Sequence, residues 1–207
     1  IPKLPEVSPA NTSAIEKLRD SGLLVMPIAQ NTNALYVNAS YKGKSFNDES
    51  IKLLQPIAPQ LLWLNVARTA ITDKATESLT NFSLLERLHA ENTQLSDAAT
   101  PNISKLTNLK YLNLYGTDIS DASIENLRKL KELEKVFLWQ TKVTATGAES
   151  LRKNFVDQKI YADLTKEKSN LTSEIDKITK SYDLELENLN AVMQKNSDKT
   201  EDASPIN

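Results

Sequence analysis

The chain has 207 residues, with 25 basic and 27 acidic side chains, one histidine and no cysteine, which gives a formal net charge of −2. That balance argues against nucleic acid or an anionic membrane surface as a partner. Without cysteine, the chain can hold no disulfide, thiolate zinc site or cysteine nucleophile. No apolar run approaches the roughly 18 residues of a membrane-spanning helix, so direct membrane insertion is not expected.

Residues 1–10 contain three prolines and no hydrophobic periodicity, so they are predicted to form an extended lead-in. A helix is predicted over 11–20, with Ser13 as its N-cap and Gly22 just beyond its end. A serine side chain accepts a hydrogen bond from the first unpaired N–H groups of a helix, and glycine adopts the backbone conformation that ends one.

Residues 11–60 as a whole are predicted to form an N-terminal cap and one irregular copy of the repeat that follows, because a repeat array must cover the open end of its core. Within this region, residues 23–28 are apolar enough to be buried. Leu35 and Val37 alternate with polar neighbours like a strand. The irregular copy carries an insertion around 40–44.

Residues 61–156 contain one pattern four times, with a period of 24 residues. In each copy the first, fourth, sixth and eleventh positions are apolar and the ninth is threonine. This is the leucine-rich repeat pattern L-x-x-L-x-L-x-x-N/C-x-L, with threonine where asparagine or cysteine is usual. Inward hydroxyl groups at the ninth position are expected to bond with their neighbours as a structural ladder, formed by Thr69, Thr93, Thr117 and Thr141.

Each repeat predicts a strand followed by a helix. The first half alternates apolar and polar residues, and the second has apolar residues three apart, as in Ile124, Leu127 and Leu130. Serine or threonine followed by aspartate marks the helix start in three copies, and the fourth copy, at 144–147, is expected to start more loosely. One repeat cannot bury its own apolar side, so the copies must stack. The predicted fold is an α/β leucine-rich repeat solenoid with a parallel inner sheet, outer helices, an N-terminal cap and a C-terminal amphipathic helix.

Beyond the repeats, residues 157–163 are predicted to add a last strand. Residues 164–195 predict an amphipathic or coiled-coil helix, and residues 196–207 are polar and predicted to be disordered. Such a helix can pack back on the array, pair with a second copy or hold another protein. A helix that projects from the array, or docks on it only in part, is favoured. Its apolar stripe is Leu171, Ile175, Ile178, Tyr182, Leu186, Leu189 and Met193.

Side chains between the buried leucines of the strands are expected to face solvent on the inner sheet, in columns across the repeats. Five of the twelve aromatic residues fall in these columns. Because tryptophan, tyrosine and arginine dominate interface energies, this surface is a candidate binding face. The candidate residues are Trp63, Asn65, Arg87, His89, Glu91, Tyr111, Asn113, Tyr115, Lys135, Phe137 and Trp139, with Ala67 in the same column as Glu91 and with Arg68, Asn92 and Gln140 at the border.

The aromatic columns can also arise without a binding role. Aromatic residues are favoured on any sheet surface, because they pack across neighbouring strands. Alternatively, the C-terminal helix of the same chain, or a neighbouring copy, covers this face.

Catalysis has little support in the sequence. His89 is the single histidine, which excludes a multi-histidine metal site, and no G-x-S-x-G turn is present for a nucleophilic serine. Glu91 lies near His89 on the predicted sheet, but a charged pair on a solvated surface is the commoner arrangement. The four glycines are not clustered, so no phosphate-binding loop is expected. We therefore expect no enzymatic activity, metal or cofactor in this chain.

Three segments carry a resemblance to a known family: LKYLNLYGTDISDASIENLRKLKELEKVFLWQTKVTATG (109–147), PQLLWLNVARTAITD (59–73) and LVMPIAQNTNALYVNAS (24–40). They resemble the repeat domains of bacterial membrane proteins that also carry a planctomycete-type cytochrome c domain. The likeness spans roughly residues 13–163 and departs from the family's T-D-x-G at Ala145. It implies a periplasmic domain of a larger redox-related protein, tethered to the membrane through regions outside this chain. The chain has no C-x-x-C-H motif, so any haem would belong to a flanking domain.

The sequence therefore supports two functions of different classes. The first is a non-catalytic interaction module that binds a protein partner or an extended ligand with its concave face. The second is a structural spacer that self-associates through residues 164–195 as a homo-oligomer. A protein partner is expected in the first case, and the sequence does not identify it.

Overall fold

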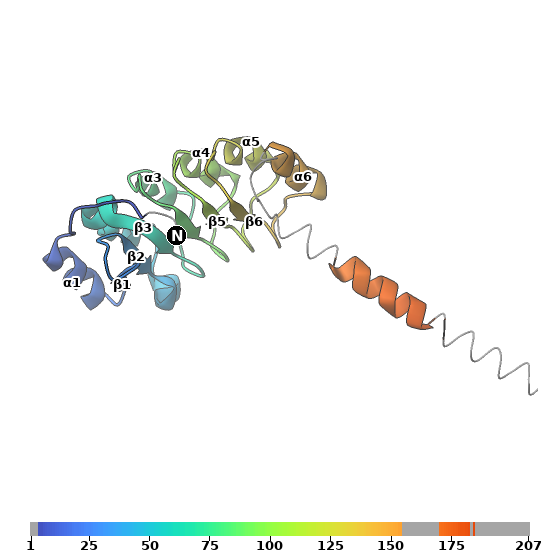
Figure 1. The fold of residues 1–207 in the computed structure, drawn as a ribbon, viewed down its shortest axis with the longest axis horizontal. Helices are drawn as coiled ribbons and strands as arrows, with labels where there is room; N and C mark the ends of the chain where they lie inside the picture. The colour runs from blue at the N-terminus through green and yellow to red at the C-terminus, as the bar shows by residue number, and fades with distance from the viewer. Residues whose placement is uncertain (1–3, 155–169, 183, 185–207) are drawn as a thin grey trace, which may run out of the picture. The chain divides into compact units, whose positions relative to one another are not determined.

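The computed structural model describes residues 4–154, 170–182 and 184. The chain divides into two compact units, Ile1–Thr165 and Lys166–Asn207. In the first unit six strands form one sheet in the order β1-β2-β3-β4-β5-β6, and helices α3 to α6 follow one another along the outside of the array (Figure 1). In the second unit, residues 170–182 and 184 are helical.

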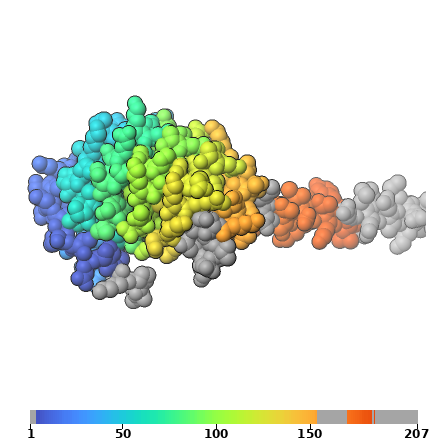
Figure 2. Space-filling view, turned by 90° about the horizontal axis from the view of Figure 1, so that it is seen from above, coloured from blue at the N-terminus to red at the C-terminus, as the bar shows by residue number. Residues whose placement is uncertain are grey.

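The repeats stack in the register that the 24-residue period predicts. Their strands β3 (Leu61–Asn65), β4 (Arg87–His89), β5 (Tyr111–Asn113) and β6 (Lys135–Phe137) are all parallel. Leu64 pairs with Leu88, and Leu112 pairs with Val136, and all four side chains are fully buried. The unit is therefore a leucine-rich repeat solenoid, and its copies appear as successive bands of colour (Figure 2).

In the first three copies the helix of the second half is shorter than predicted. The helical pieces of the four copies are α3 (Ala75–Leu79), η3 (Asp97–Ala99) with α4 (Thr100–Ile103), η4 (Asp121–Ser123) with α5 (Ile124–Leu127), and α6 (Ala145–Asn154). The prediction that one helix continues to Leu130 was wrong, because α5 ends at Leu127 and Leu130 is buried from the turn that follows. Apolar residues spaced three apart occur in α-helices and also in tight 3₁₀ turns, so this pattern does not distinguish an α-helix from 3₁₀ turns.

The fourth copy does not start its helix more loosely, contrary to expectation. The Thr144 hydroxyl accepts a hydrogen bond from the Gly147 N–H (3.1 Å) and donates one to the Asp121 carboxylate (2.7 Å). Gly147 lies so close to Asp121 that a Cβ there would collide with the carboxylate. Thr144 thus caps α6 and joins it to the preceding repeat.

Aspartates near the helix starts link consecutive repeats. Each carboxylate accepts two hydrogen bonds from one serine or threonine of the next copy, one from the backbone N–H and one from the hydroxyl. The linked pairs are Asp48–Thr72, Asp73–Ser96, Asp97–Ser120 and Asp121–Thr144. The sequence indicated helix-start charges at three of these aspartates, and the structure shows that they also connect the copies.

The threonine column closes turns within repeats. The Thr69 hydroxyl donates to the Val66 carbonyl (2.6 Å), and the three equivalent threonines donate to the carbonyl three residues earlier at 2.5–2.7 Å. Thr69 and its equivalents in the next two copies are buried. The hydroxyls satisfy carbonyls that water does not reach, but the expected ladder from copy to copy is made by the aspartates instead.

The N-terminal cap begins with α1 (Thr12–Asp20). Its N-cap is Asn11, whose side-chain oxygen accepts a hydrogen bond from the Ala14 N–H (3.2 Å), so the prediction of Ser13 as the cap was wrong. Gly22 ends the helix region as predicted, with a φ of 86° that favours glycine.

The next segment forms β1 (Leu24–Pro27), which pairs antiparallel with β2 (Leu35–Asn38) at the edge of the sheet. The prediction that residues 23–28 are buried was wrong for Leu24 and Met26, which are 41% and 44% exposed. Successive side chains of a strand point to opposite faces, so Val25 enters the core while its two neighbours point away from it.

The irregular repeat is completed by η1 (Ser40–Ser45), α2 (Asp48–Ile51) and η2 (Lys52–Gln60). The segment η1 occupies the predicted insertion. Leu54 and Ile57 are buried in the core, whereas Leu53 is exposed. This copy therefore adds to the core of the array and leaves an apolar side chain on the surface.

The helix of the second unit exposes its apolar stripe. Leu171, Ile175, Ile178 and Tyr182 are each 52–67% exposed. The predicted strand over 157–163, the rest of the predicted helix and the tail over 196–207 lie outside the described residues. No helix within the described ranges is both long and apolar enough to cross a membrane.

Candidate binding face

The strand register gathers the predicted residues on one side of the sheet, the concave face. Its first column is Met26, Tyr36, Trp63, Arg87, Tyr111 and Lys135, and its second is Leu24, Asn38, Asn65, His89, Asn113 and Phe137. Residues paired across neighbouring strands point to the same face. The residues that the sequence placed in these two columns therefore do lie next to one another across the strands.

A third column follows the ends of the strands. Backbone hydrogen bonds run from Asn92 N–H to Tyr115 O (2.7 Å) and from Gly116 N–H to Trp139 O (3.1 Å). These bonds place Glu91, Tyr115 and Trp139, which belong to consecutive copies, side by side. Ala67 was expected to face solvent in this column but is only 1% exposed, because its methyl group is covered by its neighbours.

Aromatic rings pack against one another along the concave face. Ring centroids are 4.7 Å apart for His89 and Tyr111, 5.2 Å for Tyr111 and Phe137, and 5.3 Å for Tyr115 and Trp139. All five rings are half-buried. Cross-strand packing thus accounts for part of the aromatic columns, and it also fixes the rings before any partner arrives.

Two exposed cations lie on the first column. The Arg87 guanidinium sits 4.5 Å from the centre of the Trp63 ring, a cation–π contact. Lys135 is two strands further along, with Tyr111 between them. Within the described part of the chain, neither cation has a carboxylate partner.

The acidic side chain of this face is Glu91. Its Oε1 lies 3.4 Å from His89 Nδ1, and its Oε2 is buried without a hydrogen-bond partner among the described residues. Burial raises the pKa of Glu91, but the hydrogen bond with His89 and electrostatic interactions with His89 and Arg68 outweigh it, so the pKa is lowered. Glu91 therefore holds a fixed negative charge at neutral pH.

The asparagines of the second column have a structural task. Asn65 and Asn113 accept hydrogen bonds with their side-chain oxygens from the N–H groups of Ala67 and Tyr115, each at 3.0 Å. Such bonds two residues along the chain stabilise the turn after a strand. The amide oxygens of these predicted binding residues are thus already used within the fold.

Four residues of the first two columns were missed by sequence reasoning: Leu24, Met26, Tyr36 and Asn38. They belong to β1 and β2, which precede the regular repeats, so the period does not reveal them. The two-residue alternation of buried Val25 with Leu24 and Met26 was the available signal. The ring centroids of Tyr36 and Trp63 are 6.4 Å apart, which continues the aromatic packing to the edge of the array.

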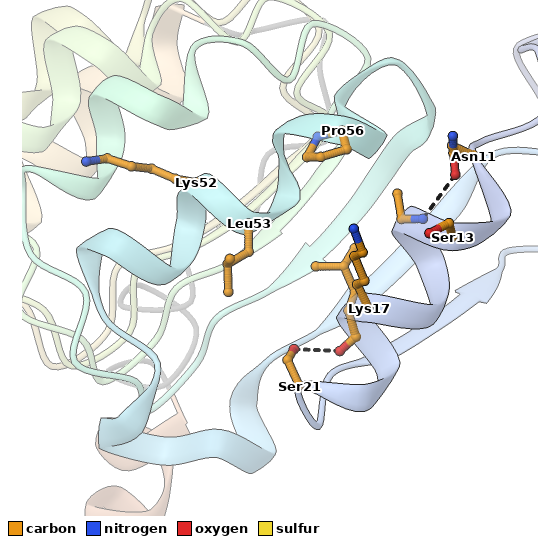
Figure 3. Close-up of a pocket in the computed structure, with 9 residues that line it drawn as sticks. Asn11, Ser13, Lys17, Ser21, Lys52, Leu53 and Pro56 are labelled. Carbon is orange, nitrogen blue, oxygen red and sulfur yellow. Dashed lines mark hydrogen bonds between the residues drawn. The ribbon is translucent and has the colours of Figure 1, made fainter.

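A separate pocket of about 610 Å³ lies between α1 and η2. Leu53 projects from η2 and Lys17 from α1 toward the space between these helices (Figure 3). Apolar, hydroxyl, amide and lysine side chains line it, and none of these lining residues is a carboxylate or histidine. More widely, the described residues contain no group of three or more histidine, aspartate or glutamate side chains suited to a metal ion.

Comparison with known proteins gives structural likenesses of low identity. No family model matches the chain, and no curated protein matches it. A leucine-rich repeat protein of Leptospira interrogans is 20% identical over 54% of this chain and 27% of its own, with a TM-score of 0.41. An internalin of Listeria monocytogenes is 24% identical over 53% of this chain and 30% of its own, with a TM-score of 0.40.

The leucine-rich repeat ectodomain of the Arabidopsis thaliana receptor kinase SOBIR1 is 12% identical over 77% of this chain and 92% of its own, with a TM-score of 0.42. The chain matches less than a third of the length of the two bacterial structures. The assignment of the fold rests on the chain's own strand register.

Proposed function

We propose that this domain is a non-catalytic interaction module that binds a protein partner with its concave face. The observation that carries the proposal is the row of half-buried aromatic rings and exposed arginine that the register places on one surface. Tryptophan, tyrosine and arginine are the side chains that contribute most to protein interfaces.

The packing of this surface supports tight binding. Tyr115 and Trp139 hold each other in place, so little side-chain entropy is lost when a partner covers them. Arg87 is likewise held over Trp63. The partner then makes contact with rings that are already ordered. The charges of Glu91 and Lys135 orient the partner.

The test is to capture partners from extracts of the source cells with the full chain and to measure affinity for each one identified. Replacing Tyr115 and Trp139 together by alanine is expected to weaken binding at least about a hundredfold, as for paired interface anchors. The control is Lys105→Ala in the turn after α4, which is expected to leave binding unchanged. Unchanged affinity in the double variant, or a melting temperature far below that of the parent chain, would falsify this role.

A second function is favoured by one observation in the helical unit. Leu171, Ile175, Ile178 and Tyr182 form an exposed apolar stripe with alternating spacings of four and three residues, as in coiled coils. The chain would then act as a spacer that self-associates through this helix. Sedimentation of the full chain and of an Ile175→Asp, Ile178→Asp variant decides this, since a monomer in both cases removes the proposal.

The surroundings of the domain are also proposed, from the resemblance of its repeats. We propose that it lies outside the cytoplasmic membrane, in the periplasm, as part of a larger membrane-tethered redox protein whose flanking domain holds haem. The sequence of residues 109–147, which resembles the repeats of such proteins, supports this proposal. The full reading frame of the gene tests it: a C-x-x-C-H motif and a membrane anchor are expected, and a frame without either contradicts it.

A further inference from the structure

We infer that the partner of the concave face presents an acidic segment, with carboxylates that bind Arg87 and Lys135 and an apolar side chain that packs on Leu24 and Met26. This inference rests on the proposed function, because it names the chemistry of the partner of that same face. It follows from three features of the face: the spacing of its cations, its charge balance and its apolar edge.

The two cations are held at a defined spacing. Arg87 pairs with Tyr111 across β4 and β5, and Tyr111 pairs with Lys135 across β5 and β6. Neighbouring strands lie about 4.8 Å apart, so the two side chains emerge roughly 10 Å apart with one tyrosine between them. Carboxylates two residues apart lie on the same side of an extended chain and about 6.6 Å from each other, and the long side chains of Arg87 and Lys135 reach over the difference.

Arg87 is prepared for a carboxylate. The guanidinium carbon lies over the Trp63 ring, 4.5 Å from its centre. The N–H donors lie along the edge of the guanidinium, where a carboxylate can accept two of them side by side. Because Trp63 already restricts the side chain, less freedom is lost when the carboxylate binds.

The charge of the face differs in sign from that of the chain. The concave face carries Arg68, Arg87 and Lys135 against Glu91, whereas the whole chain has a formal charge of −2. The Glu91 carboxylate already has a hydrogen bond with His89 and an electrostatic interaction with Arg68.

Acidic residues just outside the columns do not cancel the two cations. Glu86 is paired with Lys110 at 2.6 Å. Glu134 is exposed and precedes β6, and among the described residues no ion pair joins it to Lys135. The remaining positive charge therefore selects an acidic partner.

The opposite end of the face is apolar. Leu24 and Met26 are exposed on β1, next to half-buried Tyr36 on β2. Strand β1 lies three strands from β4, or roughly 14 Å from the Arg87 position at the usual strand spacing. A partner segment that crosses the strands thus has a preferred direction, with its apolar side chain toward β1 and its carboxylates toward β4 and β6.

The experiment is selection of random twelve-residue peptides displayed on phage against the immobilised full chain and against an Arg87→Glu, Lys135→Glu variant. The parent chain is expected to select peptides with an apolar residue and two acidic residues. The variant is expected to lose those peptides and to select lysine or arginine instead. Synthetic copies of the selected peptides should bind the variant at least about tenfold more weakly, and they should bind the parent more weakly in high salt.

The outcomes separate this inference from the proposed function. Selected peptides that need Tyr115 and Trp139 but carry no acidic residues, or that bind the charge-reversed variant equally well, overturn the inference and leave the binding face standing. Competition by single-stranded DNA at equal concentration would assign the cations to phosphate, which also overturns it. Peptides whose affinity is unchanged by Arg87→Glu, Lys135→Glu, Tyr115→Ala and Trp139→Ala contradict the proposed function itself. A Lys105→Glu variant controls for charge elsewhere, and Lys135→Ala replaces the double variant if that one fails to fold.

Discussion

At one equivalent residue in each repeat, the turn after the strand adopts a left-handed backbone conformation. The φ angle is 58° at Arg68, 54° at Asn92, 66° at Gly116 and 54° at Gln140. For most residues with a side chain this conformation costs about 1–2 kcal/mol. Gly116 has a second constraint, because a Cβ there would collide with the side chain of Asn92.

Replacing Gly116 by alanine is therefore expected to lower the free energy of unfolding by about 1–3 kcal/mol, through backbone strain and the collision together. The matched control is Gln140→Gly in the same column. There, relief of strain opposes the extra freedom of the unfolded chain, and the net change stays within about 1 kcal/mol. Urea denaturation measures both variants. A Gly116→Ala variant as stable as the parent would show that the turn relaxes freely.

Residue positions on the concave face were predictable wherever the period applies. Trp63, Tyr111 and Trp139 follow from counting, because a 24-residue shift in a parallel stack is a move to the next strand. Met26 was missed because β1 precedes the repeats and pairs antiparallel. Ala67 was wrongly predicted to be exposed. Alternation predicts the direction of a side chain, but it does not predict whether larger neighbouring side chains cover it.

Between elements, the link from aspartate to the next repeat is the polar contact that recurs in every copy. Asp97 accepts hydrogen bonds from the Ser120 N–H (2.8 Å), the Ser120 hydroxyl (2.5 Å) and the Ser123 hydroxyl. Burial raises the pKa of Asp97, but these hydrogen bonds outweigh it and lower the pKa below the ordinary value of 3.8. The ionised form is the one that joins the copies.

Asp97→Ala is expected to cost about 1–3 kcal/mol in the free energy of unfolding at pH 7, because the Ser120 N–H loses its acceptor. A carboxyl group with a lowered pKa stabilises the fold above its unfolded pKa, and this stabilisation disappears as pH falls through the folded pKa. The difference from the parent chain should thus shrink below about pH 4.

The control for Asp97 is Asp118→Ala. It removes an ion pair with Lys142 whose side chains are 66–69% exposed. Such pairs contribute less than about 1 kcal/mol. If chemical denaturation shows the same loss for Asp97→Ala at pH 7 and pH 3, the carboxylate is not the linking form.

At the level of elements, the order of strands and the stacking of copies were predictable, and helix lengths were not. Apolar residues three apart occur in α-helices and in 3₁₀ turns alike, so Leu130 was placed in a helix that ends at Leu127. The hydrogen bonds that each aspartate accepts from the next copy could not be predicted from the sequence, for another reason. Serine followed by aspartate is also a common helix start, and the sequence does not show that the carboxylate reaches the next copy.

At the scale of the whole molecule, the concave face combines packed rings, two exposed cations and an apolar edge on one surface. The repeat unit supplies stability through its stacked leucines, and the side chains between them form the proposed recognition surface. The helix of the second unit carries its own exposed stripe, so the proposed recognition and the proposed self-association use different parts of the chain.

Both tryptophans of the chain, Trp63 and Trp139, lie on the concave face, so their fluorescence reports on it directly. The decisive measurement is titration of a captured partner into Trp63→Phe and Trp139→Phe variants, each with one remaining tryptophan. Because binding removes water from the ring, the emission of Trp139 is expected to shift to shorter wavelength. Emission that stays unchanged in both variants, while sedimentation shows the complex, would place the binding surface elsewhere.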